Sequence, residues 1–482
     1  MRLATPASPL TPWPIGHSSG AQQVWPGQTN AHSPWTLHVA AQEELAEAPG
    51  PLDEHVAGGP GAERKSGGYP MSMAYEGIRI IDFTQLEQGP VGTQVLADFG
   101  AEVIKIERID VGDILRGNRP IVNGLSSFFA ACNRNKKSLS VNLKTPEGKE
   151  IIYKLVKISD VVASNFRPGV MERLGFGWEE LSKINPRIIC AYASGYGQTG
   201  PYRDRRGQDL IAQAMGGLMA LTGARNGPPT AAGTFVADFV GGMLFAQGIM
   251  AALAARERTG KGQVVDSCLL NTVVTLPIGE ATSYLNAGQT YPRAYHGGCH
   301  SAFGPLYATY QTKDGKWLVI VGTYVDRELK RVFTALGVES DLPDDPRFQA
   351  SADGWPDIGV GREAELRPIL EKAFSLMTQE EALRRLEEQD ILAAPVYEHS
   401  DVFSDPQIIH NKMIQEIEHP VAGNVKLVGV PVKLSETPAT LRLAPPTVGQ
   451  HNEEILALLD YAGEPLRQLQ QGGIIGSENL KG

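Results

Sequence analysis

A single carboxylate, Asp238, lies in the apolar, glycine-flanked stretch FVADFVGG at residues 235–242. Burying an unpaired charge is costly, so an ionisable residue in such surroundings needs a physical reason. The residues alone leave two reasons open. Asp238 is either the N-cap of a following helix, or a nucleophile whose ionised form is favoured by the amides and dipole at the start of that helix.

Histidine is absent between His55 and His296, across the main part of the chain. Acid–base or nucleophilic chemistry in this region therefore falls to carboxylates, tyrosine or lysine. A carboxylate acts as a nucleophile when it is held ionised and poorly solvated. The absence of histidine draws attention to Asp238, although the local sequence by itself favours a plain cap.

Basic residues gather at expected turns of a chain whose net charge is −10. Basic clusters at strand ends fit a ligand with several phosphate groups, and a solvated surface charge is the alternative for each residue taken singly. The residues concerned are Arg108, Lys136, Lys137, Lys144, Arg167, Arg173, Arg205 and Arg206.

The stretch GYGQTGP, residues 195–201, has the glycine spacing of a dinucleotide-binding turn. Its context does not fit, because Pro201 and a basic run follow instead of a helix, and no acidic residue lies about 20 positions further on. Glu107 ends a predicted strand where it could hold a ribose, but the glycines before it lack the required spacing. A bent basic loop is therefore expected here rather than a nicotinamide site.

Alternating strands and helices are predicted to position these residues. Short apolar runs indicate buried parallel strands, and Thr145 followed by Pro146 indicates a helix start. This alternation predicts an open α/β sheet with helices on both faces. The expected elements are strands at 77–83, 101–108, 160–166 and 187–194, and helices at 89–99, 145–158 and 238–258.

The domain organisation follows from shifts in composition. Residues 1–72 are rich in Pro, Gly, Ala and Ser, so we expect disorder there, and Met71 or Met73 as an alternative start. From about residue 304 a hairpin turning at Asp314-Gly315 and a capping box at Thr378 indicate a smaller α+β domain. The predicted parts are a large α/β domain (73–290), a small domain with linkers (291–405) and a return to the large domain (406–482).

Composition narrows the class of protein. The 482 residues are 42% hydrophobic, the pI is near 5.6, and no apolar run looks long enough to span a bilayer. These values argue against a general nucleic-acid or membrane-surface binder. The four cysteines are widely spaced, which is typical of reduced thiols in a cytoplasmic protein.

Several long motifs in the same order make the chain similar to a known family. The chain resembles the class III coenzyme A transferases (the CaiB/BaiF family), which include formyl-CoA:oxalate and carnitine CoA-transferases and also α-methylacyl-CoA racemases. The resemblance runs from about Gly77 to Leu456. The motifs that carry it are GIRIIDFTQLEQGP, LADFGAEVIKIER, NRNKKSLSVNLKTPEG, NFRPGVMERLGF, YASGYGQTGPY, GQDLIAQAMGGLMALTG, ADFVGG, RTGKGQVV and VGQHNEEIL.

The resemblance implies a fold, a reaction and a site. It implies a ring-shaped subunit with a Rossmann-like large domain and a smaller one, in an interlocked homodimer. It implies transfer of CoA from an acyl-CoA to a carboxylic acid through an aspartyl nucleophile at Asp238, with CoA as substrate and no permanent cofactor or metal. The implied CoA contacts are Glu87, Gln88, Arg108, Val141, Lys144, Asn165, Phe166, Arg167, Arg173, Arg206 and Asp209, and the implied substrate loop holds Gly297, Gly298 and His300.

Departures from the family pattern leave the substrate open. Tyr295 and Gly298 replace an Arg and an Asn of the glycine loop, and Phe128 and Gln208 stand at tyrosine positions of formyl-CoA transferase, so oxalate or formate is not supported. A racemase is the nearest alternative. Asp209 matches its aspartate, but its histidine position aligns with Glu179. A non-catalytic acyl-CoA binder is the alternative from another class.

Overall fold

The computed structural model of the chain describes residues 73–294, 298, 300, 303–322, 325–348 and 363–476. The expectation of disorder over residues 1–72 lies outside the described residues. The described residues form four sheets, of which the two larger ones have separate apolar cores and are each described by themselves below.

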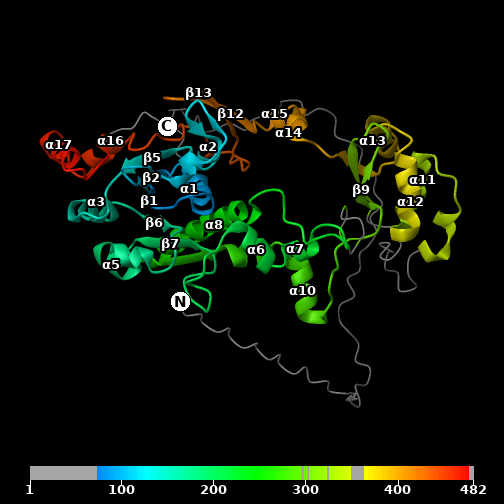
Figure 1. The fold of residues 1–482 in the computed structure, drawn as a ribbon, viewed down its shortest axis with the longest axis horizontal. Coiled ribbons are helices and arrows are strands. Elements are labelled where there is room, and N and C mark those ends of the chain that lie inside the picture. Colours follow the sequence, from blue (N-terminus) through cyan, green and yellow to red (C-terminus); the bar gives the residue numbers. More distant parts are fainter. Residues whose placement is uncertain are drawn as a thin grey trace, which may run out of the picture. The chain divides into compact units, whose positions relative to one another are not determined.

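The larger sheet has six strands, and every neighbouring pair is parallel (Figure 1). Counted along the chain among themselves, these strands lie in the order 3-2-1-4-5-6, which is the order of a doubly wound nucleotide-binding sheet. The four strands predicted from the sequence are present. In sheet order the strands are β5 (Lys136–Ser140), β2 (Glu102–Glu107), β1 (Arg79–Asp82), β6 (Val161–Ser164), β7 (Ile189–Ser194) and β8 (Val264–Cys268).

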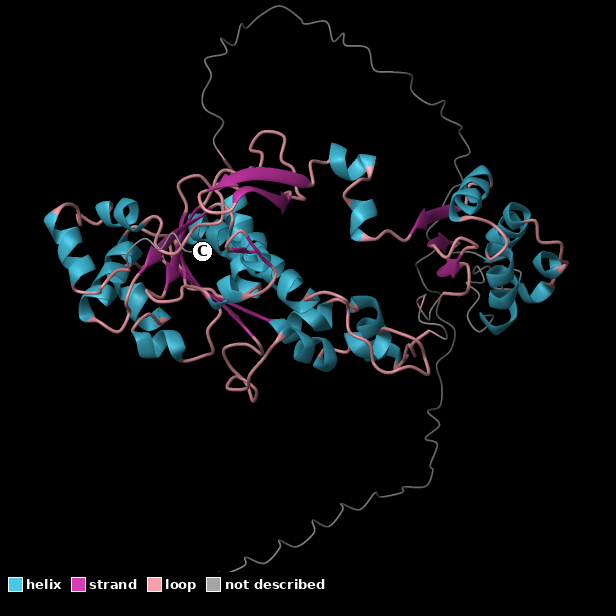
Figure 2. Ribbon diagram, turned by 45° about the horizontal axis from the view of Figure 1, so that its top comes forward, coloured by secondary structure: helices cyan, strands magenta, loops and turns pink. Residues whose placement is uncertain are grey.

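Helices cover both faces of this sheet, as the alternating pattern predicts (Figure 2). Successive strand residues point to opposite faces, so Ile80 and Ile81 enter different cores. One face packs against α1 (Gln88–Asp98) and α8 (Val236–Thr259). The other packs against α3 (Pro146–Lys157), α5 (Trp178–Ile184), α16 (Asn452–Ala457) and α17 (Glu464–Gln471).

Glycines let α1 and α8 cross closely. A Cβ added at Gly92 would lie 2.7 Å from the Gly242 carbonyl oxygen, and one at Gly242 would lie 2.6 Å from the Gln88 carbonyl oxygen. Only glycine permits this backbone approach. The crossing therefore brings the start of α1 next to the start of α8, where Asp238 lies.

Two helix starts test the capping predictions. Thr145 caps α3 as expected, since its hydroxyl accepts a hydrogen bond from the Gly148 amide and Pro146 is the first helical residue. The helix predicted at 89–99 begins one residue earlier, at Gln88, so Pro90 is its third residue. The predicted helix start is therefore confirmed for α3, and for α1 the observed start lies earlier in the chain than predicted.

The apolar helix α8 corrects one statement made from composition. Among the described residues it is the one helix that is long and apolar enough, by those two measures, to cross a membrane. Nearly half of its most apolar window is buried, and Phe245 and Ile249 pack in the core against the sheet. We therefore interpret α8 as a core helix, whose buried face explains its apolar sequence.

The smaller sheet is antiparallel, in the order β11 (Leu392–Pro395), β10 (Trp317–Val321), β9 (Tyr307–Gln311). It shares a core with α11 (Val325–Leu336), α12 (Glu363–Phe374) and α13 (Gln379–Glu388). The predicted hairpin is present, and the Thr378 hydroxyl accepts from the Glu381 amide at the start of α13. The exact domain boundaries stay a prediction.

The C-terminal part returns to the edge strand β5. The His451 amide donates to the Ser138 carbonyl, and the Ser140 amide donates to Asn452 Oδ1. The remaining elements are η1 (Ile114–Gly117), β3 (Ile121–Val122), β4 (Leu125–Ser126), α2 (Ser127–Asn133), α4 (Val170–Leu174), α6 (Asp209–Met215), α7 (Leu218–Leu221), α9 (Leu269–Thr275), α10 (Ile278–Ala287), η2 (Leu342–Asp344), η3 (Pro346–Phe348), α14 (His399–Val402), α15 (Pro406–His410), β12 (Ile414–His419) and β13 (Gly423–Val428).

Candidate active site

The carboxylate Asp238 lies in the first turn of α8, but it does not cap the helix. Phe235 occupies the N-cap position and makes no side-chain cap bond. The capping role falls to Asp209, whose Oδ1 accepts from the Ala237 amide at 2.7 Å and from the Asp238 amide at 3.3 Å. Its Oδ2 accepts from Gln213 Nε2 at 2.6 Å. The interpretation of Asp238 as a plain N-cap is therefore wrong.

Asp238 lies close to two other carboxylates, Glu87 and Asp209, at the start of α8. Burial and these two charges together determine its protonation. Burial, then Glu87, then Asp209 raise the pKa of Asp238 to about 7. Burial and Asp209 also raise the pKa of Glu87. The prediction that the helix start favours the ionised form of Asp238 does not hold for its pKa, which burial and the charges of Glu87 and Asp209 raise. A carboxylate that titrates near neutrality is typical of a reactive position.

The Gln88 amide lies beside this carboxylate group without a partner. Gln88 is buried, and its Nε2 has no hydrogen-bond acceptor among the described residues. A Cβ added at Gly241 would lie 3.2 Å from that nitrogen. An unpaired buried donor is costly, so it marks a place where a ligand oxygen would complete the bonding.

Aromatic rings flank the first turn of α8. The Phe235 ring lies edge-on to Phe239, with centroids 6.5 Å apart, and edge-on to Phe128 at 6.1 Å. These ring contacts place Phe235 and Phe239 in one apolar cluster with Phe128. This cluster provides apolar surface next to the turn that carries Asp238.

A cavity of about 630 Å³ opens at the carboxyl ends of β1, β2 and β5. In doubly wound sheets this is the edge at which ligands bind. Arg108 reaches Asp110 Oδ2 at 2.5 Å on an exposed part of its rim, where a phosphate could compete for the guanidinium. Of the residues predicted to contact CoA, Arg108, Val141, Lys144 and Phe166 line this cavity.

A second cavity, of about 390 Å³, shares Phe166 with the first. Four arginines line it, so it favours an anionic ligand. The predicted residues Asn165, Arg167 and Arg206 lie on its wall. Arg173 lies exposed on α4 and lines neither of these two cavities. The four arginines are Arg167, Arg203, Arg205 and Arg206.

Three residues considered as ligand contacts in the sequence are bonded to other side chains of the protein. Lys136 is fully buried in β5, where its Nζ donates to Asp82 Oδ2 at 3.0 Å. Lys137 pairs with Glu102 and Glu454. Glu107 is buried and bonds to Arg116 through both carboxylate oxygens, so it is not free to hold a ribose. The ligand-binding interpretation of Lys136 and Lys137 is wrong, because the stretch that carries them is a strand and not a turn, whereas the bonds of Glu107 agree with the rejection of a ribose site there.

The predicted substrate loop is described only in part. Gly297 lies outside the described residues. The Gly298 carbonyl accepts from the Thr309 amide at 2.9 Å, and His300 Nε2 lies 2.8 Å from Glu280 Oε1. Closure of this loop over a substrate stays a prediction.

Sequence reasoning missed Gln213, which holds the capping carboxylate of Asp209. The signal was available, since residues 209 and 213 are four apart on the apolar run that forms α6, and such pairs face each other on a helix. It also missed the buried ion pairs under the loop that leads into α1. Lys136 and Asp82 are 54 residues apart, and Lys105 and Asp113 lie on opposite sides of the turn after β2, so no helical or strand spacing marks either pair.

Comparisons with known proteins identify the family of the chain. The sequence model of CoA-transferase family III matches residues 75–452. An acyl-CoA transferase of Fusarium pseudograminearum is 38% identical, covering 83% of this chain and 88% of that protein, and a mouse succinyl-CoA:glutarate CoA-transferase is 36% identical over 84% and 91%. The crystal structure of a CaiB/BaiF family protein from Brucella suis superposes with a TM-score of 0.71 at 32% identity, covering 81% of this chain and all of that one. The chain belongs to CoA-transferase family III.

Proposed function

We propose that the chain moves coenzyme A from an acyl-CoA donor to a carboxylic acid acceptor, with Asp238 as the nucleophile. The observation that carries this proposal is the setting of Asp238, a poorly solvated carboxylate with a pKa of about 7 beside an unpaired amide donor. Membership of the family supports CoA transfer as the reaction class.

The first half of the proposed reaction loads the enzyme. A carboxylate oxygen of Asp238 attacks the thioester carbonyl, the C–S bond breaks, and CoA leaves as a thiolate, giving an acyl–aspartyl anhydride. The thiolate then attacks the aspartyl carbonyl of the anhydride. This releases the donor acid as a carboxylate and leaves Asp238 as a CoA thioester.

The second half repeats these steps in reverse order with the acceptor acid. The acceptor carboxylate attacks the aspartyl thioester and expels CoA thiolate, which then attacks the acceptor acyl carbonyl and regenerates the Asp238 carboxylate. The unpaired Nε2 of Gln88 is a suitable donor to the oxygen that becomes negative at each tetrahedral stage. Water would hydrolyse these intermediates, so we also propose that the loop around Gly297, Gly298 and His300 closes over the site.

Binding of CoA is assigned to the two cavities that share Phe166. The 3′-phosphate and pyrophosphate of CoA match the cationic groups on their walls, including Arg108, Lys144, Arg167 and Arg206. Glu87, Gln88 and Asp209 belong in this proposal to the reactive end of the site. Asn165 already bonds Gln85 through both its amide atoms, and Arg173 lines neither cavity, so these two are the weakest members of the proposed set.

Quaternary structure and domain arrangement form a further part of the proposal. We propose a ring-shaped subunit within an interlocked homodimer, with the three chain segments predicted from the sequence as its parts. Large apolar side chains left exposed on α10, at Ile278, Tyr284 and Leu285, support a protein interface. Sedimentation equilibrium tests the dimer, and a monomeric mass would contradict it.

Replacing Arg108 by alanine is expected to weaken CoA binding roughly tenfold, because one charge-assisted contact to a phosphate is lost. Isothermal titration with CoA and with CoA lacking its 3′-phosphate measures the effect. Arg187→Ala, at an exposed arginine paired with Glu257, is the matched control and should leave affinity unchanged. Equal affinity of wild type and Arg108→Ala for CoA would remove Arg108 from the site.

The transfer rate is expected to rise with pH through about 7, because only ionised Asp238 attacks and its pKa is about 7. Saturating single-turnover rates between pH 5.5 and 8.5 measure this dependence. Glu87→Gln should move the rise to lower pH, since it removes one of the charges that raises the pKa. A rate independent of pH in this range would contradict the proposed protonation state.

The racemase alternative receives less support from the site. Glu179, at the racemase histidine position, lies exposed on α5, and both carboxylate oxygens of Asp209 bond to α6 and the start of α8. Relatives named for succinyl-CoA with glutarate, D-citramalate or L-malate suggest dicarboxylic acceptors to try first. Mass spectrometry with these acids, with oxalate and with α-methylacyl-CoA in D₂O separates acid exchange from racemisation.

A further inference from the structure

The loop from Phe83 to Glu87 joins β1 to α1 and delivers Glu87 and Gln88 to the start of α8. We call it the β1–α1 loop. Leu86 within it has a φ of +61°, a left-handed conformation that a leucine rarely adopts. Such a residue persists only where its surroundings determine the backbone. The contacts that determine it are buried side chains, and they follow the loop residue by residue.

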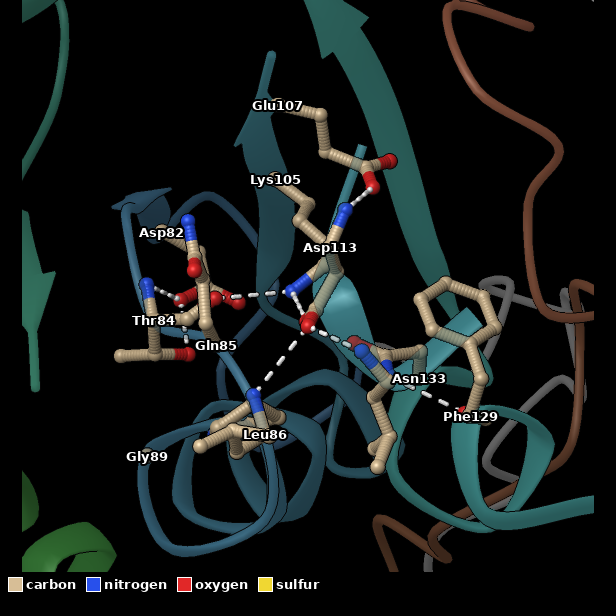
Figure 3. Close-up of polar contacts among 12 residues, drawn as sticks. Asp82, Thr84, Gln85, Leu86, Gly89, Lys105, Glu107, Asp113, Phe129 and Asn133 are labelled. Carbon is tan, nitrogen blue, oxygen red and sulfur yellow. Dashed lines mark hydrogen bonds and ion pairs between the residues drawn. The ribbon is translucent and has the colours of Figure 1, made fainter. Parts of the chain in front are cut away.

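The Lys105–Asp113 pair lies beside this loop and contacts its backbone (Figure 3). Lys105 Nζ donates to the Thr84 carbonyl at 2.8 Å and lies 2.8 Å from Asp113 Oδ2, and both side chains are fully buried. Asp113 Oδ1 accepts from the Leu86 amide at 3.2 Å. The two charges thus bind each other and also bind the backbone on either side of residue 85.

Two further side chains, the buried Asp82 and the half-buried Asn165, complete the set of backbone contacts. Asp82 Oδ1 accepts from the Thr84 amide at 2.9 Å. Asn165 donates to the Gln85 carbonyl at 2.6 Å and accepts from the Gln85 amide at 2.8 Å. Three consecutive residues of the loop are therefore bonded to side chains from other elements, Thr84 and Leu86 to buried ones and Gln85 to the half-buried Asn165. The loop cannot take another path without leaving some of these buried groups unpaired.

We propose that Lys105 and Asp113 are positioning residues of the transfer reaction, which hold the β1–α1 loop so that Glu87 and Gln88 face Asp238. The inference rests on the proposed role of Asp238. A buried ion pair stabilises a fold little better than apolar residues of the same size. Its value here lies in geometry, because each member bonds a backbone group of the loop that carries the active-site side chains.

The test is the double variant Lys105→Met/Asp113→Asn. It removes both charges together, so no unpaired charge stays buried, and the asparagine Oδ1 can still accept from the Leu86 amide. The bond to the Thr84 carbonyl is lost. The expected result is a fall in kcat of about 100-fold, as small misplacements near reacting atoms produce. The acyl-CoA Kd should change by a smaller factor than kcat, because Phe83 and Gln85 of the same loop line the cavity assigned to CoA.

The matched control is Arg134→Met/Asp98→Asn. This pair is also buried, with a 2.7 Å contact, but it binds Val428 and the C-terminal segment rather than the β1–α1 loop. It should lower the thermal midpoint as much as the test variant does while leaving kcat unchanged. An equal loss of kcat in both variants would overturn the positioning role and leave a general effect on folding.

The pH dependence of the transfer rate is a second measurement, and a loss of stability alone would not change it. Glu87 and Asp209 are the two groups whose charges raise the pKa of Asp238. If the loop is released and Glu87 withdraws, the rise of rate with pH should move to lower pH, as in Glu87→Gln. Adding Glu87→Gln to the test variant should then produce no further movement.

Each failure has a separate meaning. A test variant with wild-type kcat and wild-type pH profile would overturn the inference while leaving the nucleophile untouched. Retained transfer in Asp238→Ala would instead overturn the proposed function. If this double variant does not fold, Lys105→Gln/Asp113→Asn, which also leaves no buried charge unpaired, should give a smaller loss of kcat with the same direction of pH movement, and an unchanged profile in that variant would also overturn the inference.

Discussion

Replacing Asp238 by alanine is expected to reduce CoA transfer by at least about 10⁴-fold. The proposed route uses Asp238 as its one nucleophile. Of the two neighbouring carboxylates, Asp209 is already bonded to the start of α8 and to Gln213. Both the anhydride and the aspartyl-CoA thioester form on this one side chain. Exchange of labelled acid into acyl-CoA measures the loss, and mass spectrometry of the wild type should find the adduct on the peptide that contains residue 238.

The same variant is expected to fold at least as well as the wild type. The pKa of Asp238 is about 7 in the folded chain and near 3.8 when unperturbed, so between these pH values the unfolded chain releases a proton that the folded chain keeps. Stability is therefore lost as pH rises toward 7, and the loss persists above it. Alanine removes this loss, so the advantage of the variant in urea should grow between pH 5 and pH 8, by roughly 1–3 kcal/mol.

The control for this prediction lies on the same helix. Glu257 is an exposed carboxylate near the end of α8, and Glu257→Ala should leave transfer unchanged. Transfer at the wild-type rate by Asp238→Ala would contradict the nucleophile and would favour a different catalytic group. Acyl-CoA binding without transfer in the wild type would support the non-catalytic binder.

Local sequence signals predicted much of the fold. The apolar runs gave the four inner strands, and Thr145-Pro146 gave the start of α3, because these features depend on neighbours in the chain. Asp238 was also found locally, as a charge in an apolar stretch. Its pKa was not, since burial and the charges of Glu87 and Asp209 raise it, and these two residues come from the β1–α1 loop and from α6.

The basic residues show where this reasoning fails. Arg108 and Arg206 line cavities, while Lys136, with the same charge at what looked like a turn, enters the interior. The difference is a partner, because Asp82 lies 54 residues away on β1 and neutralises Lys136 in the folded sheet. A single sequence does not reveal such pairing, so a buried lysine and a phosphate-binding lysine look alike.

Replacing Lys136 by methionine is expected to lower the free energy of unfolding by roughly 3–5 kcal/mol, which is the usual cost of removing one partner of a buried ion pair. Both side chains of the Lys136–Asp82 pair are fully buried. Lys136 Nζ also donates to the Pro90 carbonyl and to Asn133 Oδ1, so three acceptors lose their donor together. Urea denaturation at pH 7 measures the loss.

Two further variants decide what the loss means. Asp82→Asn/Lys136→Met should recover much of the stability, since neither charge is then left alone, and the cycle of single and double variants gives the coupling between them. Arg187→Ala, at an exposed pair, should cost no more than about 1 kcal/mol. If Lys136 instead bound a phosphate of CoA, Lys136→Met would keep its stability and lose CoA affinity. The buried pair requires the opposite result, with stability lost and the CoA affinity of the folded fraction retained.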